Sequence, residues 1–104
     1  MARTPEESIS GNLEFAQCLR ALRARLVGKQ VALSMAVRCT EAAISFWEAG
    51  RRLPVQLSLA RIQEALIKSG ATQFELDELR SAWQRAYRRK SDPEMVMPSL
   101  ERDQ

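Results

Sequence analysis

Arginine and lysine are the side chains through which this chain could act on a partner, because groups suited to catalysis or metal binding are scarce. The 104 residues include no histidine, and the two cysteines, Cys18 and Cys39, lack the spacing of a zinc-binding pair. The sequence also shows no nucleophile paired with a base and no glycine-rich phosphate loop. We therefore expect a protein without enzymatic activity, metal or cofactor.

The positive charge is concentrated in one part of the chain. Lys and Arg number 16 and Asp and Glu number 13, which gives a formal net charge of +3. Residues 12–70 carry nine positive and four negative charges, a net +5, whereas residues 91–104 carry one positive and four negative, a net −3. A basic core suits nucleic acid, because Lys and Arg that face phosphates release condensed counterions. Basic cores also occur without that function, so charge alone leaves the partner open.

The two ends of the chain are polar and differ in composition from its middle. Residues 1–11 are predicted to be a flexible leader, and residues 91–104, with two prolines and an acidic excess, a flexible acidic tail. No signal peptide and no apolar run of about 18 residues is present, so we expect a cytoplasmic protein without a membrane contact. Cys18 and Cys39 are expected to be reduced and to act as small core hydrophobes.

The apolar pattern between these ends predicts helices. Large apolar side chains recur at helical spacing between Asn12, a suitable N-cap, and Gly28, a suitable helix stop. They are Phe15, Leu19, Leu22 and Leu26. Residues 29–37 alternate large and small apolar side chains, as a strand would, but the small ones are alanine and serine and no partner strand is in sight. We therefore predict a helix over 29–37 as well.

Capping residues divide the next part of the chain. Thr40 is a good N-cap for a helix over 40–49, which Gly50 would end. Pro54 can open the following helix at its first position, and Gly70 would close it. An all-helical domain over residues 12–70 results.

One more helix is predicted beyond that domain, over residues 73–89, opened by a capping box of Thr72 and Glu75. Its apolar stripe consists of Leu76, Leu79, Trp83 and Tyr87. This stripe could pack back on the rest of the domain or pair with a second copy of the chain, and we expect it to do some of both. Residues 71–90 are thus an additional C-terminal helix and a possible dimer or partner face.

The segment from Gln30 to Gly50 resembles the helix-turn-helix of the Cro/C1-type (Xre-type) phage repressor family. In that family a Gln opens the second helix, a Leu-small pair lies in its middle, a short turn follows, and the third helix ends in an Ile-Ser-x-aromatic-Glu-x-Gly run. The corresponding residues here are Gln30, Leu33-Ser34, Val37 to Cys39, and Ile44 through Gly50. The flanking Leu22-Arg23 and Arg51 to Pro54 match as well. The resemblance implies an all-α, five-helix, repressor-like domain.

Two residues depart from the family pattern. Ser34 replaces the usual Ala, and Arg38 replaces the usual Gly of the turn. A residue other than Gly costs about 1–2 kcal/mol in a left-handed conformation. We expect the turn to be reshaped or mildly strained and the fold to tolerate both changes.

The resemblance implies double-stranded DNA as a partner, with the helix over 40–49 in the major groove and the protein acting as a dimer on an operator. The face toward the groove would consist of Thr40, Glu41, Ala42, Ser45 and Phe46. Phosphate contacts would come from Gln30, Arg38, Arg51 and Arg52. This face lacks the Arg, Asn and Gln side chains that usually discriminate between bases. The resemblance thus implies a small transcriptional regulator.

Other interpretations of these residues stay open. Arg51 and Arg52 could form a solvated turn, and Glu41 could simply complement the helix dipole. Phe46, an aromatic residue on a face expected to be polar, must be covered by DNA or by a protein. The alternatives are therefore an antiactivator or inhibitor that contacts a transcriptional regulator, or an antitoxin that binds a toxin.

Overall fold

The computed structural model describes residues 3–90, and these residues form helices joined by short loops, with no strand among them. The first helix, α1 (Arg3–Leu22), continues into a π-helical turn, η1 (Arg23–Val27). It is followed by α2 (Gln30–Val37), α3 (Glu41–Glu48), α4 (Gln56–Lys68) and α5 (Gln73–Lys90). The predicted all-α, five-helix fold is confirmed, whereas the predicted acidic tail lies outside the described residues.

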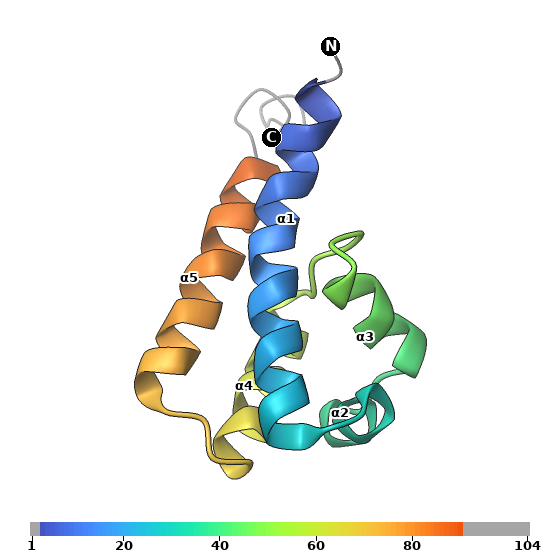
Figure 1. Cartoon of the computed structure of the whole chain (residues 1–104), viewed down its shortest axis with the longest axis vertical. Coiled ribbons are helices and arrows are strands. Elements are labelled where there is room, and N and C mark those ends of the chain that lie inside the picture. Colours follow the sequence, from blue (N-terminus) through green and yellow to red (C-terminus); the bar gives the residue numbers. More distant parts are fainter. Residues whose placement is uncertain (1–2, 91–104) are drawn as a thin grey trace, which may run out of the picture.

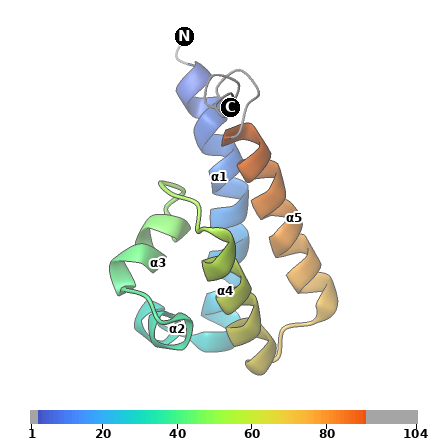
Figure 2. The same ribbon diagram turned by 180° about the vertical axis from the view of Figure 1, so that it is seen from behind.

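The long helix α1 runs through the middle of the molecule and separates its two sides. Helix α5 lies antiparallel to α1 on one side, and α2 and α3 lie on the other (Figure 1). Helix α4 covers the back of α1 between them, as the reverse view shows (Figure 2). The outer surfaces of α3 and α5 therefore face away from each other.

The start of α1 corrects one prediction. The predicted helix start at Asn12 is wrong, because α1 begins at Arg3 and passes through Asn12 without interruption. Pro5 lies in the first turn, where its missing N–H group needs no helical partner, so it does not break the helix. Gly28 ends the helix as predicted, at φ +103°, and its N–H donates to the carbonyl of Arg23 at 2.8 Å.

The predicted pair of short helices is present. The bounds of α2 and α3 lie within one residue of the predicted ones, so the alternating pattern in α2 is helical and not a strand. Arg38, which stands where the family pattern has a turn Gly, adopts the left-handed conformation at φ +67°. Thr40 caps α3, since its Oγ1 accepts a hydrogen bond from the N–H of Ala43 at 3.0 Å.

Pro54 does not open α4, contrary to prediction. The helix starts at Gln56, after Val55 in an extended conformation. Pro54 is buried in the preceding loop, and its carbonyl accepts a hydrogen bond from Nε1 of Trp83 at 2.7 Å. This tertiary contact, which local sequence cannot reveal, fixes the proline outside the helix.

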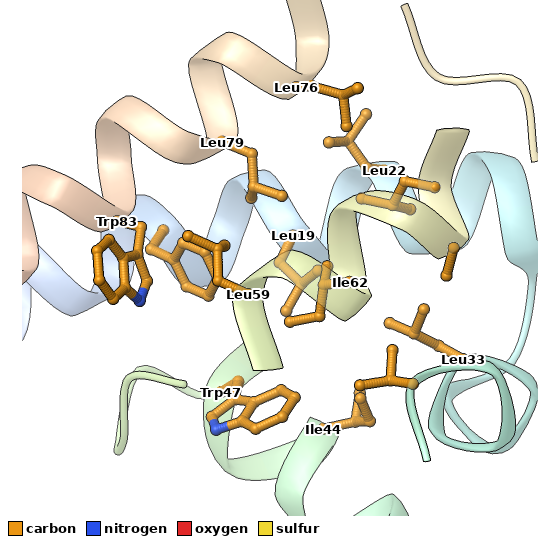
Figure 3. Packing of buried hydrophobic residues seen from close by; sticks show 14 of the residues in the cluster. Leu19, Leu22, Leu33, Ile44, Trp47, Leu59, Ile62, Leu76, Leu79 and Trp83 are labelled. Atoms are coloured by element: carbon orange, nitrogen blue, oxygen red, sulfur yellow. The ribbon is translucent and has the colours of Figure 1, made fainter. Parts of the chain in front are cut away.

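One hydrophobic core joins all five helices (Figure 3). Among its fully buried side chains are Leu19, Leu33, Ile44, Ile62 and Leu79. Cys18 and Cys39 are half-buried at its edge, as unpaired thiols. None of the helices in the described part of the chain is both long enough and apolar enough to span a bilayer.

Three of the four residues of the possible dimer face on α5 pack back on the domain, which is one of the two roles expected for this stripe. Leu76, Leu79 and Trp83 are only 4%, 0% and 7% exposed because they pack into the core of the same chain. Tyr87 alone is exposed, and its ring stacks on Trp83 with centroids 4.9 Å apart. Helix α5 is therefore part of the same core as the rest of the fold.

Replacing Leu79 tests this assignment of α5. Leu79→Ala should lower the free energy of unfolding by about 2–5 kcal/mol, because it removes buried methyl groups and leaves a cavity. Leu57→Ala is the matched control, since the side chain of Leu57 is 61% exposed and its loss should cost about 0.5 kcal/mol or less. Urea unfolding followed by circular dichroism measures both. A separate early transition for α5, or equal effects of the two variants, would contradict a shared core.

The capping box of α5 predicts a pH dependence. Glu75 Oε1 accepts from the backbone N–H of Thr72 at 2.9 Å, while Thr72 Oγ1 accepts from that of Glu75 at 3.1 Å. The hydrogen bond from the Thr72 backbone and the nearby charge of Arg25 hold the pKa of Glu75 below its usual value. The ionised Glu75 therefore stabilises the fold fully above the ordinary pKa of a glutamate. This stabilisation is lost as pH falls through the lowered pKa of Glu75.

Glu75→Gln should therefore flatten the fall in unfolding free energy between neutral and acid pH, as measured by urea unfolding at a series of pH values. Thr72→Val is the control, because it keeps the backbone N–H that is the main cause of the shift. This variant should retain most of the pH dependence. If the unfolding free energies of Glu75→Gln and of the unmodified protein fell in parallel with pH, the capping box would not be the cause of the pH dependence.

Candidate nucleic-acid interface

A buried ion pair fixes the position of α3. The side chain of Glu48, at the end of α3, is 4% exposed, and that of Arg23, in η1, is 13% exposed. Arg23 donates from Nε to Glu48 Oε2 at 2.8 Å and from Nη2 to Oε1 at 2.6 Å. Its Nη1 also donates to the carbonyl of Gly28 at 2.6 Å. The hydrogen bonds to Glu48 raise the pKa of Arg23, against the partial burial that would lower it.

Gln30 belongs to the same cluster. Its Nε2 donates to Glu48 Oε1 at 2.9 Å, so the side chain predicted to bind phosphate is already engaged inside the domain. The three side chains come from η1, α2 and α3, and together they hold the two short helices against the end of α1. Sequence reasoning missed Arg23 and Glu48 as positioning residues, although both lie in the segments that carry the family resemblance.

The outer face of α3 has the exposure that was predicted. All five of its expected contact residues are exposed, namely Thr40, Glu41, Ala42, Ser45 and Phe46. Phe46 is 40% exposed, and the guanidinium carbon of Arg52 lies 5.4 Å from the centre of its ring. This cation–π contact places a positive charge beside the only aromatic group on the face.

Exposed arginines stand at both ends of α3. Arg51 and Arg52 follow it after Ala49 and Gly50, and Arg38 lies in the turn before it. With eight residues, α3 spans about 12 Å between them. Arg38, however, also lines a hollow of about 360 Å³ with Arg61 and Lys68 of α4. The structure thus brings Arg51 and Arg52 together with Phe46, and places Arg38 toward α4.

The edge of this face carries guanidinium groups, and the face itself carries few groups that could read bases. The flanking guanidinium groups can donate bidentate hydrogen bonds to phosphate oxygens. Within the face, Ser45 offers a hydroxyl, Glu41 offers an acceptor for the amino group of cytosine, and Ala42 and Phe46 offer apolar contact to thymine methyl groups. These groups favour affinity for DNA of any sequence over discrimination between sequences.

Glu48 is the residue whose replacement should most disturb the position of α3. Glu48→Gln should lower the free energy of unfolding by about 3–5 kcal/mol, because the charge of Arg23 loses its buried partner. Replacing both residues, as Arg23→Met with Glu48→Met, should cost less than that, since no unpaired charge remains. Urea unfolding followed by tryptophan fluorescence measures both variants.

The control for Glu48 is an exposed ion pair. Glu64 lies 3.7 Å from Lys68 with both side chains more than half exposed, so Glu64→Gln should change the unfolding free energy by less than about 1 kcal/mol. Similar losses for Glu48→Gln and Glu64→Gln would show that the buried cluster does not stabilise the fold more than a surface pair does.

The comparisons with known proteins add no relative to this description. No family model matches the sequence, and neither the curated proteins nor the solved structures include a match. The role of the α3 face must therefore be inferred from its own residues, their exposure and their charge.

Proposed function

We propose that this protein is a small DNA-binding transcriptional regulator that inserts α3 into the major groove of an operator. The observation that carries the proposal is the exposed face of α3 with the exposed Arg51 and Arg52 beyond its C-terminal end, on a pair of short helices locked by the Arg23–Glu48 ion pair. The resemblance of residues 30–50 to Cro/C1-type repressors supports the same function. A net charge of +5 over residues 12–70 adds a general attraction to phosphate.

In this proposal Arg51 and Arg52 bind the phosphate backbone and set the register of α3 on the duplex. The N-terminal end of α3 points its backbone N–H groups and Thr40 toward the bases or the adjacent phosphate. Arg52 has two roles in this proposal. Its guanidinium lies against the ring of Phe46, and the N–H groups at its outer edge donate to a phosphate. Gln30 acts indirectly, by holding Glu48.

A two-fold dimer on palindromic half-sites is part of the proposal. Because the apolar stripe of α5 is buried, the contact between copies must use another surface. Two exposed apolar side chains adjoin Trp83 of that stripe: Tyr87, which stacks on its ring, and Val55, which follows the Pro54 whose carbonyl Trp83 binds. This small patch is the proposed site of self-association.

Neutralising the two arginines after α3 tests the DNA-binding function. Arg51→Gln with Arg52→Gln should weaken binding to a short duplex of mixed sequence. The slope of log affinity against log salt concentration should become shallower by about two, one for each lost phosphate contact. Fluorescence anisotropy at several salt concentrations measures both quantities.

The matched control removes the same charge elsewhere. Arg80→Gln with Arg88→Gln lowers the net charge equally, but both residues are exposed on α5, across the molecule from α3. The control should keep the original salt slope. An equal loss in both variants would indicate a general charge effect, and no salt-sensitive binding by the unmodified protein would refute the proposed function.

A second function is favoured by the apolar character of the helix-turn-helix surface. Besides Phe46, Val31 and Met35 of α2 are 43% and 74% exposed, and the α3 face offers few hydrogen-bond donors. A protein that binds a transcriptional regulator or a toxin through this surface would use these side chains. In that case Phe46→Ala would abolish binding of the partner protein, while Arg51→Gln with Arg52→Gln would leave that binding unchanged.

A further inference from the structure

A groove runs between α1 and α5, on the side of the molecule away from α3. It has a volume of about 900 Å³ and is lined by residues from both helices, from Glu14 to Arg25 on α1 and η1 and from Phe74 to Arg85 on α5. None of these residues belongs to the α3 face. The groove is therefore a separate surface of the domain.

Two ion pairs mark the ends of this groove. At one end Arg85 donates from Nη2 and Nε to the two carboxylate oxygens of Glu14, at 2.6 and 3.1 Å. At the other end Arg25 pairs with Glu75. Eleven residues separate Glu14 from Arg25, which corresponds to about 16 Å along a helix. The groove is therefore about three helical turns long.

Small side chains leave the middle of the groove hollow. Cys18 and Ala21 of α1 face Ser81 and Ala82 of α5 between the two ion pairs. Phe74 stands at the edge with 69% of its surface exposed. A large apolar side chain from a partner would fill the hollow and cover this ring.

The charge of the groove is opposite to that of the chain as a whole. Four carboxylates line it against two guanidinium groups, and both guanidinium groups are taken up by the ion pairs at its ends. In the described part of the chain Asp77 and Glu78 form no salt bridge, and Asp77 accepts a hydrogen bond from Nε2 of Gln73 at 2.9 Å. The pKa of the Cys18 thiol is raised by burial and then by the nearby carboxylates, of which Glu78 contributes most.

We propose that this groove binds a cationic amphipathic helix of a partner protein. The groove lies between two antiparallel helices, so a third helix can lie along it with an apolar side chain over Cys18 and Ala82. Lysine or arginine side chains on the same helix then meet Asp77 and Glu78. Charge excludes other occupants: nucleic acid is repelled, and so is the acidic segment 91–104 of this chain.

The proposal does not depend on DNA binding by α3. A helix in the groove covers α5 and leaves the face of α3 open, because the two lie on opposite sides of α1 (Figures 1 and 2). The domain can therefore bind its partner on one side and a second macromolecule on the other. A regulator built in this way recruits one protein to the place where α3 binds.

The probe is a synthetic amphipathic helix made of leucine and lysine, and its control is the same peptide with glutamate in place of lysine. Fluorescence anisotropy gives the affinity of each labelled peptide for the full chain. Glu78→Gln should weaken binding of the lysine peptide about threefold, as the loss of one exposed ion pair does, and Asp77→Asn with Glu78→Gln should weaken it further. Phe74→Ala should weaken it as well. Glu64→Gln removes an equal charge on α4 and should leave the affinity unchanged.

Alkylation of the cysteines locates the bound peptide. The lysine peptide should slow alkylation of Cys18 severalfold and leave Cys39, in the α2–α3 turn, unaffected, as mass spectrometry of the two sites can show. A lysine side chain bound near Cys18 favours the thiolate, which by itself would speed alkylation. Slower alkylation therefore shows that the peptide covers the thiol.

Four outcomes would overturn the proposal. They are equal binding of the glutamate peptide, protection of Cys39 in place of Cys18, unchanged affinity of the Asp77 and Glu78 variants, and no binding at all. Self-association of the chain that disappears in the Asp77→Asn with Glu78→Gln variant would assign the groove to a second copy instead. Sedimentation of both proteins in the absence of peptide tests that outcome.

Discussion

The carboxylate of Glu48, buried at the end of α3, is the constraint on which the rest of the helix-turn-helix depends. Burial of a charge is costly unless it is paired and hydrogen-bonded, and Arg23 and Gln30 supply both conditions. Each partner comes from a different helical segment, so the cluster can form only when all three segments are correctly placed. It therefore selects one arrangement of α2 and α3, which apolar packing alone would leave less specific.

A second polar contact connects the two sides of the molecule. The hydrogen bond from Trp83 to the carbonyl of Pro54 ties α5 to the loop that begins with Arg51 and Arg52. The position of those arginines relative to α3 is thus influenced by a helix on the far side of the core. Helix α5 is an integral part of the domain, which explains why Leu76, Leu79 and Trp83 point inward.

Much of the fold could be predicted because its signals are local. The stripe from Phe15 to Leu26, the cap at Thr40 and the capping box of Thr72 and Glu75 depend on residues within one or two turns of each other. The exposed face of α3 could also be anticipated, from the resemblance of residues 30–50. Each of these features is encoded by a spacing that only a helix satisfies.

The remaining features depend on distant parts of the chain. The pairing of Arg23 with Glu48 spans 25 residues and that of Trp83 with Pro54 spans 29, so no local pattern reveals either contact. The same limit applies to Gln30, whose type suits a phosphate contact but whose partner is a buried carboxylate. The start of α1 was missed for another reason, because Pro5 suggests a break in sequence and is harmless in a first turn.

The π-helical turn η1 has a consequence for how this domain can vary. Such a turn holds one residue more than the α-helical turn it replaces, so it behaves as an insertion that the helix has absorbed. Deleting one residue from Arg23–Val27 would close this widened turn as a regular α-helical one, and the segments downstream would keep their orientation because the deletion removes the residue that the turn had absorbed. A change of one residue in chain length is therefore expected to be tolerated within η1 better than within the regular turns of α1, provided that Arg23 keeps its pairing with Glu48.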